Sequence, residues 1–131
     1  MINLNYAIKI NGILPIYLIE YKRYDNWVFI NRGWGNGYVG IPSFHPYFGK
    51  TYEELKFIKV HGEITYSQLD KDSGLWILGF DTGHRYLGDT IETCPYEFVL
   101  NEAINLREQC INEKEFQIIL KLNNLKNLFF K

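Results

Sequence analysis

The stretch PYEFVLNEAINLREQC, residues 95–110, decides the fold class of this chain. Its apolar residues recur every three or four positions, which is the spacing of one face of an amphipathic helix. Pro95 suits the first turn of such a helix, because that turn needs no hydrogen bond from its backbone nitrogen. The apolar positions are Tyr96, Val99, Leu100, Ala103, Leu106 and Cys110. We expect this helix to lie across a sheet and to supply half of the core.

The residues before this helix alternate between apolar and polar types in short runs, which is typical of β-strands. Residues 75–80, LWILGF, form the most apolar run, and an Asn-Gly turn ends the run at residues 7–12. The glycine-rich residues 33–40 predict a hairpin or a bulge. Further strands are expected at residues 14–24, 27–30, 38–41, 57–60 and 63–68. The sequence therefore predicts an α+β fold, in which an antiparallel sheet of about five to six short strands packs against a C-terminal amphipathic helix.

The chain has the length of one domain, at 131 residues. Beyond Asn112, the spacing of Phe116, Ile119 and Leu120 predicts a second, shorter helix. The end of the chain is rich in Asn, Leu and Lys and is expected to be a frayed helix or a peripheral segment. We therefore divide the chain into a single α+β domain, residues 1–112, and a C-terminal helical appendage, residues 113–131.

Charge and cysteine content exclude several classes of protein. The net charge of -1 gives no electrostatic case for binding duplex DNA, which favours a basic face. Cys94 and Cys110 lie far apart without CxxC spacing, which argues against a disulfide scaffold and favours a reducing cytoplasm. No apolar run approaches the roughly 18 residues of a membrane span. We expect a cytoplasmic protein without a membrane segment, for which homo-oligomerisation stays open.

Three blocks of sequence in the centre of the chain carry a resemblance. They are GYVGIPSFHPYFGK at residues 37–50, VHGEITY at residues 60–66 and WILGFDTGH at residues 76–84, followed by Gly88-Asp89. Their order and content resemble a family of small uncharacterised proteins of phages, mobile elements and bacteria, over roughly residues 32–109. The resemblance implies a functional site in these blocks and an accessory role in a phage or mobile element, in the host cytoplasm if phage-encoded.

The chain departs from this family at two places that matter for the site. Glu63 stands where a second glycine is usual after His61. Residues 85–87 are extra residues between His84 and Gly88-Asp89. The insertion raises the question of whether Asp89 reaches the same place as its counterpart in the family.

All three histidines of the chain lie in these blocks, and imidazole can act as an acid, a base or a metal ligand near neutral pH. We predict a catalytic group of His61, His84 and Asp81. If a divalent metal such as zinc is bound, the predicted ligands are His45, His61, His84 and Asp81. The alternative is that each histidine only bonds backbone groups. Further residues expected to contact a ligand are Tyr38, His45, Tyr47, Lys50, Thr65, Tyr66, Arg85 and Asp89.

The sequence predicts an accessory protein that binds a small anionic ligand, for example to sequester a nucleotide-derived immune signal. One alternative is a metal-dependent or histidine-based hydrolase of a phosphoester or nucleotide. The other alternative is a protein–protein inhibitor of a host defence or nuclease component. The expected partner is thus a small anionic ligand or a host protein.

Overall fold

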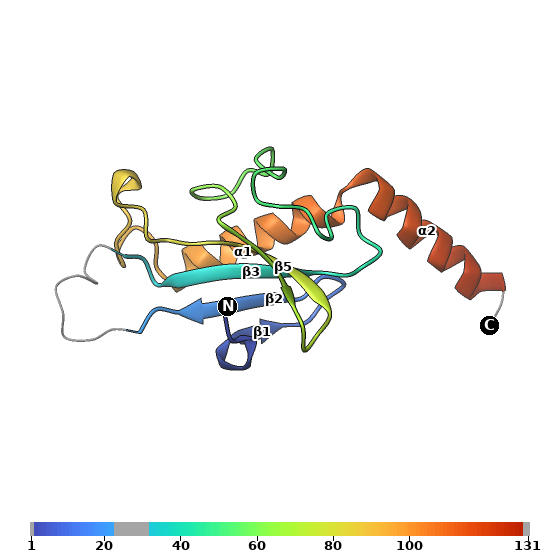
Figure 1. The fold of residues 1–131 in the computed structure, drawn as a ribbon, viewed down its shortest axis with the longest axis horizontal. Helices are drawn as coiled ribbons and strands as arrows, with labels where there is room; N and C mark the ends of the chain where they lie inside the picture. Colours follow the sequence, from blue (N-terminus) through green and yellow to red (C-terminus); the bar gives the residue numbers. More distant parts are fainter. Residues whose placement is uncertain (1, 23–31, 130–131) are drawn as a thin grey trace.

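The computed structural model describes residues 2–22 and 32–129, so the strand predicted at residues 27–30 lies outside the described residues. Five strands and two α-helices make up the fold (Figure 1). The strands are β1 Ile8–Ile10, β2 Ile16–Glu20, β3 Gly35–Ile41, β4 Tyr66–Asp70 and β5 Leu75–Phe80, and the α-helices are α1 Tyr96–Ile111 and α2 Lys114–Phe129. Two short 3-10 turns are η1 Leu4–Tyr6 and η3 Arg85–Leu87.

The five strands form one open antiparallel sheet in the order β1-β2-β3-β5-β4. β3 lies in the centre, where Ile41 pairs with Trp76 of β5 and Val39 pairs with Ile16 of β2. The α+β class and the antiparallel sheet predicted from the sequence are confirmed. Among the described residues, no helix is long and apolar enough to cross a membrane.

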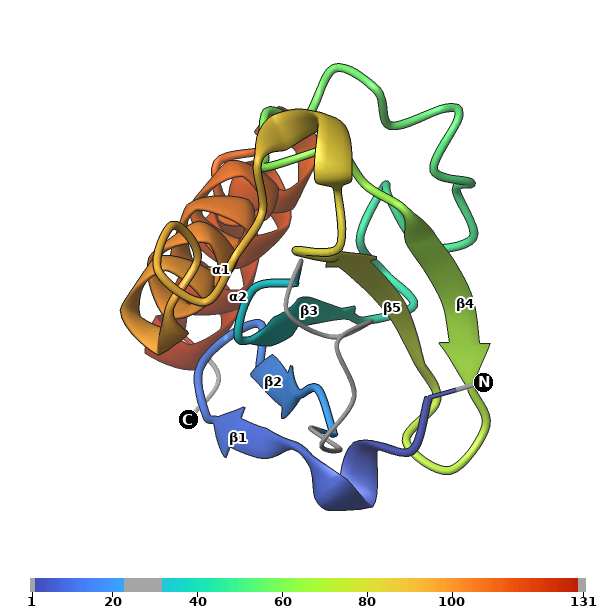
Figure 2. The ribbon, with the colours of Figure 1, turned by 90° about the vertical axis from the view of Figure 1, so that its left-hand side faces the viewer.

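The two faces of the sheet are covered differently. One face carries the main core, in which α1 buries Val99, Ala103 and Leu106 against the alternate residues of β2, β3 and β5. The other face carries a smaller cluster of Tyr17, Tyr38 and Ile77. The N-terminal segment crosses this second face from the edge at β4 toward β1 (Figure 2), and it packs apolar side chains on the cluster.

The glycine-rich residues 33–40 are not a hairpin, because β3 already begins at Gly35. The crowding of the sheet centre explains why glycines stand in a central strand. A Cβ atom at Gly37 would lie 2.6 Å from a ring carbon of Phe80, in the next strand. The glycine therefore makes room for a large neighbour, and the hairpin prediction is wrong.

The strand predicted at residues 57–60 is also absent, since these residues form turns and bends. The backbone of Lys59 bonds to side chains of α1 instead of to a neighbouring strand. Its N–H donates to Gln109 Oε1 at 3.0 Å, and its carbonyl accepts from Gln109 Nε2 and Asn105 Nδ2, each at 2.9 Å. Side-chain amides thus satisfy the groups that a strand would have used.

The second helix, α2, is as long as α1, with 16 residues in each, and not shorter as the sequence suggested. Its first turn is anchored by Phe116, which is fully buried. Leu120, one turn further on, also packs against the core. The later turns of α2 project from the body, at the end of the molecule opposite η3 (Figure 1). The predicted appendage is therefore joined to the core by its first two turns.

Candidate functional site

The structure brings together two histidine–aspartate pairs, which we call the paired-histidine site. His61 Nε2 lies 2.8 Å from Asp89 Oδ1, and His84 Nε2 lies 3.1 Å from Asp81 Oδ1. The two imidazole rings contact each other, with centroids 5.9 Å apart. Each histidine side chain keeps a small accessible area, 16% for His61 and 13% for His84.

The position of His61 depends on α1 and on an unusual backbone turn. Its backbone N–H donates to Glu102 Oε1 at 2.8 Å, and its ring packs edge-on against Phe98, 5.1 Å between centroids. Gly62 and Glu63 then both adopt positive φ, at 67° and 68°. Glu63 is the residue that departs from the family pattern, and it holds a conformation that glycine adopts more readily.

Gly62 is needed for close packing as well as for its backbone angle. A Cβ atom there would lie 2.3 Å from His84 Nε2 and 2.5 Å from His84 Cδ2. No side chain fits between this backbone and the imidazole. The turn at Gly62 therefore determines how near the two histidines lie to each other.

The extra residues 85–87 form the 3-10 turn η3, which ends at Gly88 in the left-handed region, φ 73°. The chain then turns back, and the backbone N–H of His84 donates to Asp89 Oδ2 at 2.8 Å. The insertion is thus absorbed in one turn, and Asp89 does reach the site.

Asp89 is only 2% exposed, and both of its oxygens have partners. One oxygen faces His61 and the other accepts from the His84 backbone, which is how a buried carboxylate is satisfied. Cys94 is the third neighbour, with Sγ 3.7 Å from Asp89 Oδ1 and 4.0 Å from His61 Nε2. Burial raises the pKa of the Cys94 thiol, and the negative charges of Asp89 and Glu102 add to this effect.

Asp81 is oriented by contacts that do not involve histidine. Its Oδ2 accepts from the Thr65 hydroxyl at 2.9 Å, and its Oδ1 accepts from the Gly83 N–H at 2.9 Å. His84 Nε2 lies 3.1 Å from the same Oδ1, but the two atoms are not aligned for a hydrogen bond. This buried nitrogen therefore has no hydrogen-bond partner. The carboxylate is thus held in place, while the imidazole beside it has an unused ring nitrogen.

His45 does not join the other two histidines. Its Nε2 donates to the Cys110 carbonyl at 2.8 Å, and its Nδ1 accepts from the Tyr47 N–H at 2.9 Å. Cys110 lies near the end of α1, about 18 Å along the helix from Phe98, whose ring packs against His61. The four-residue metal set predicted with His45 is therefore not brought together, because both ring nitrogens of His45 have structural partners elsewhere.

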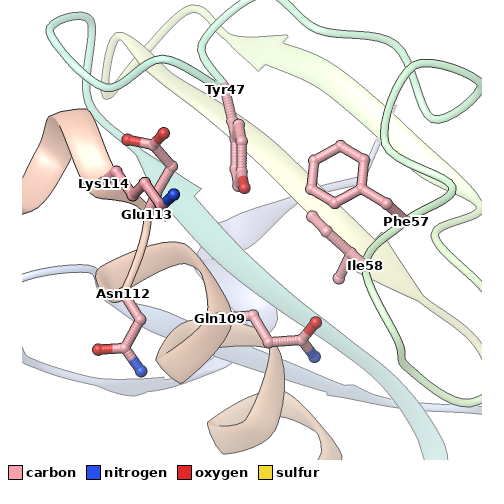
Figure 3. Close-up of a pocket in the computed structure, with 7 residues that line it drawn as sticks. All are labelled: Tyr47, Phe57, Ile58, Gln109, Asn112, Glu113 and Lys114. Atoms are coloured by element: carbon pink, nitrogen blue, oxygen red, sulfur yellow. The ribbon is translucent and has the colours of Figure 1, made fainter.

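The predicted ligand residue Tyr47 lies at a different place from the histidine pairs. It lines a cavity of about 400 Å³ between the loop after β3 and the junction of α1 with α2. Figure 3 shows Tyr47 and Phe57 on one side of this cavity, with Gln109 of α1 and Glu113 on the other side. Burial raises the pKa of Tyr47, with smaller effects from Cys110 and Glu113.

Three further predicted ligand residues are also outside the paired-histidine site. Tyr38 and Tyr66 lie on the second face of the sheet, with ring centroids 5.5 Å apart, and burial raises the pKa of Tyr38 to about 12. Lys50 forms an exposed ion pair with Glu54 at 3.5 Å. Arg85 directly follows His84, in η3, and its side chain is exposed. The ligand set predicted from the sequence is thus spread over several surfaces, and Thr65, Asp89 and Arg85 are its members next to the catalytic group.

The sequence reasoning missed Cys94 and Glu102. Neither has a local spacing that marks it, since Cys94 is 33 residues from His61 and Glu102 is 41 residues from it. A catalytic triad is not formed, because Asp89 and Cys94 both face the same nitrogen of His61. Among the described residues, His61, Asp89 and Cys94 form a group of three side chains that could together bind a metal ion. Their ligand atoms lie within 4.8 Å of one another.

Comparison with protein-family models, with curated proteins and with solved structures found no match to this chain. The resemblance to the phage-type family therefore stays a prediction from the sequence blocks.

Proposed function

We propose that the paired-histidine site hydrolyses a phosphoester bond in a small anionic ligand of nucleotide type. The observation that carries this proposal is the contact between two imidazoles, each beside its own carboxylate. A carboxylate next to histidine orients the ring and stabilises its protonated form, which is what acid–base catalysis needs. Of the three functions predicted from the sequence, the geometry supports the hydrolase best.

His84 is the residue that we assign as general base. Its ring takes a proton from water, whose oxygen then forms a bond to phosphorus. The bond from phosphorus to the leaving oxygen breaks, and His84 returns the proton to that oxygen. Asp81, held by Thr65 and Gly83, stabilises His84 while it carries the proton. His61, beside Asp89, is the other half of the pair, and a positive charge held near its ring would offset the negative charge of the phosphoryl group.

Three carboxylates surround the two rings, because Asp81, Asp89 and Glu102 all lie against the histidines or their backbone. An anionic ligand or substrate therefore needs a positive charge nearby in order to bind. The hydrolase is placed ahead of the binding protein because a carboxylate beside each imidazole suits proton transfer, which simple binding does not require. The accessory role in a phage stays a prediction from the resemblance.

The test is a panel of labelled nucleotides and a generic phosphodiester, assayed for product and for binding by calorimetry. We expect turnover by the wild type and a loss of about 100-fold or more in H61Q and H84Q. H45Q is the matched control, because it removes the histidine that lies apart from the site. Below the melting temperature of this variant, its turnover should equal that of the wild type. Stoichiometric capture without product would reject hydrolysis and support the binding function instead. Equal turnover in all three variants would place the chemistry elsewhere.

A further inference from the structure

Cys94 is a buried side chain of the site that the proposed hydrolysis does not use. It is 2% exposed and lies directly before the first turn of α1. Its sulfur lies 4.0 Å from His61 Nε2 and 3.7 Å from Asp89 Oδ1, while that nitrogen and oxygen are 2.8 Å apart. One nitrogen, one oxygen and one sulfur donor therefore converge from three separate segments of the chain.

The three distances are compatible with one bound cation. A triangle of these sides has a point about 2.1 Å from all three atoms. Zinc has bonds of about 2.0–2.1 Å to histidine nitrogen, about 2.0–2.2 Å to carboxylate oxygen and about 2.3 Å to cysteine sulfur. A cation slightly out of the plane of the three donors meets all three values without a rearrangement of the backbone.

We propose that His61, Asp89 and Cys94 bind a divalent cation of the zinc type. Imidazole and thiolate donors suit zinc better than magnesium or calcium, which prefer oxygen donors. Three protein ligands leave the fourth position of a tetrahedral ion for water, as in catalytic zinc sites. Binding displaces the thiol proton of Cys94, because the thiolate is the ligand.

Hydrogen bonds outside the three donors hold them in position. Asp89 Oδ2 accepts from the backbone N–H of His84, so Oδ1 is left to face the cation. The backbone of Cys94 is fixed on both sides, because its N–H donates to the Thr90 carbonyl at 2.8 Å and its carbonyl accepts from the Trp34 N–H at 2.7 Å. Outer contacts of this kind orient metal ligands in known sites.

A second observation points to the same place. His84 Nε2 is buried without a hydrogen-bond partner, and its ring contacts the ring of His61. A buried polar atom without a partner carries a free-energy cost, so such atoms are rare in folded proteins. This nitrogen belongs to the ring that lies next to His61, the nitrogen donor of the proposed cation site.

The cation site is tested without any assay of turnover, so its failure is distinct from failure of the proposed hydrolysis. The full chain is purified without a chelator or a histidine tag, and zinc is measured by elemental analysis. The protein is then loaded with cobalt(II), whose bond to a thiolate gives a charge-transfer band in the near ultraviolet. We expect about one equivalent of zinc in the wild type and this band in the cobalt form.

Two cysteine variants give a matched comparison. C94A should lose the band and bind zinc about 100-fold more weakly or worse, whereas C110A, which alters the cysteine at the other end of α1, should keep both. H61N should weaken binding in the same way as C94A, and circular dichroism of each variant verifies folding. The proposal is overturned if the wild type binds neither ion at micromolar concentration, or if C94A and C110A give the same spectrum and affinity.

Discussion

At the scale of single residues, Gly62 has two separate constraints that one pair of variants can resolve. Gly62→Ala combines a positive φ with a clash against His84, whereas Gly74→Ala has a positive φ but no atom within 4 Å of its new Cβ. Both variants should lose about 1 kcal/mol of unfolding free energy, because alanine adopts a positive φ less readily than glycine. We expect only Gly62→Ala to lose more than this in urea unfolding. We also expect only Gly62→Ala to shift the imidazole resonances of His84 in NMR spectra. Equal losses in the two variants would contradict the clash.

His45 makes the stability of the protein depend on pH. Burial lowers the pKa of His45, against the opposing effects of the Cys110 carbonyl and Glu113. The unfolded chain binds a proton at this residue below about pH 6.5, where the folded chain does not. The stabilising contribution of neutral His45 is therefore present at about pH 7 and is lost as the pH falls through 6.5 toward the lower folded pKa.

H45Q removes this titration. We expect the unfolding free energy of the wild type to fall more steeply between about pH 7 and pH 5 than that of H45Q, measured by urea titration at each pH. Parallel curves for the two proteins would show that His45 does not titrate differently in the folded state.

The sequence predicted the centre of the site better than its periphery. His61, His84, Asp81, Thr65 and Asp89 were found because histidine and aspartate in glycine-rich blocks are chemically conspicuous. Tyr47, Lys50 and the paired tyrosines of the sheet have side chains that suit stacking on a base or contact with a phosphate, yet they lie apart from the histidine pairs. Strand direction decides which face a residue joins, and residue type alone does not contain that information.

At the scale of elements, α2 is anchored by its first two turns, through Phe116 and the partly buried Leu120. Phe116 is fully buried, and the centroid of its ring lies 4.5 Å from that of His45 and 6.0 Å from that of Phe44. The side chain of Ile118, in contrast, is 57% exposed. We expect Phe116→Ala to cost about 3–5 kcal/mol of unfolding free energy, and Ile118→Ala about 0.5 kcal/mol or less, by urea unfolding. Similar costs at both positions would mean that α2 packs over its whole length.

The elements differ in how well the sequence predicted them. β5 and α1 were placed almost to the residue, since an unbroken apolar run and a three- and four-residue period are both strong local signals. Residues 57–60 have the composition of a strand, but the backbone of Lys59 bonds to Gln109 and Asn105, about 50 residues away. Long-range competition of this kind leaves no trace in a local pattern.

At the scale of the whole molecule, the N-terminal segment acts as the cover of the second sheet face. Ile2 and Leu4 pack on the cluster that contains Tyr38, and the Ile2 N–H approaches the Tyr66 hydroxyl at 3.4 Å. Removal of residues 1–6 should therefore expose this face. We expect the Tyr38 phenol, whose pKa burial raises to about 12, to ionise closer to the ordinary value of about 10.

Tyrosinate absorbance during an alkaline titration checks this expectation, with Y38F identifying the signal of Tyr38 in the full-length and shortened chains. An unchanged titration of Tyr38 after the deletion would mean that other residues bury the phenol.

The strand order also has a consequence for the kinetics of folding. β4 and β5 are joined by a short turn, and hairpins of this kind form within about 1–10 μs. The pairing of Ile41 with Trp76 instead closes a loop of about 35 residues, which is entropically costly and slower. His61 and Gly62 lie inside that loop. The β4–β5 hairpin is therefore expected to form before β3 pairs with β5, and the segment that carries His61 and Gly62 is held in place only when that long loop closes.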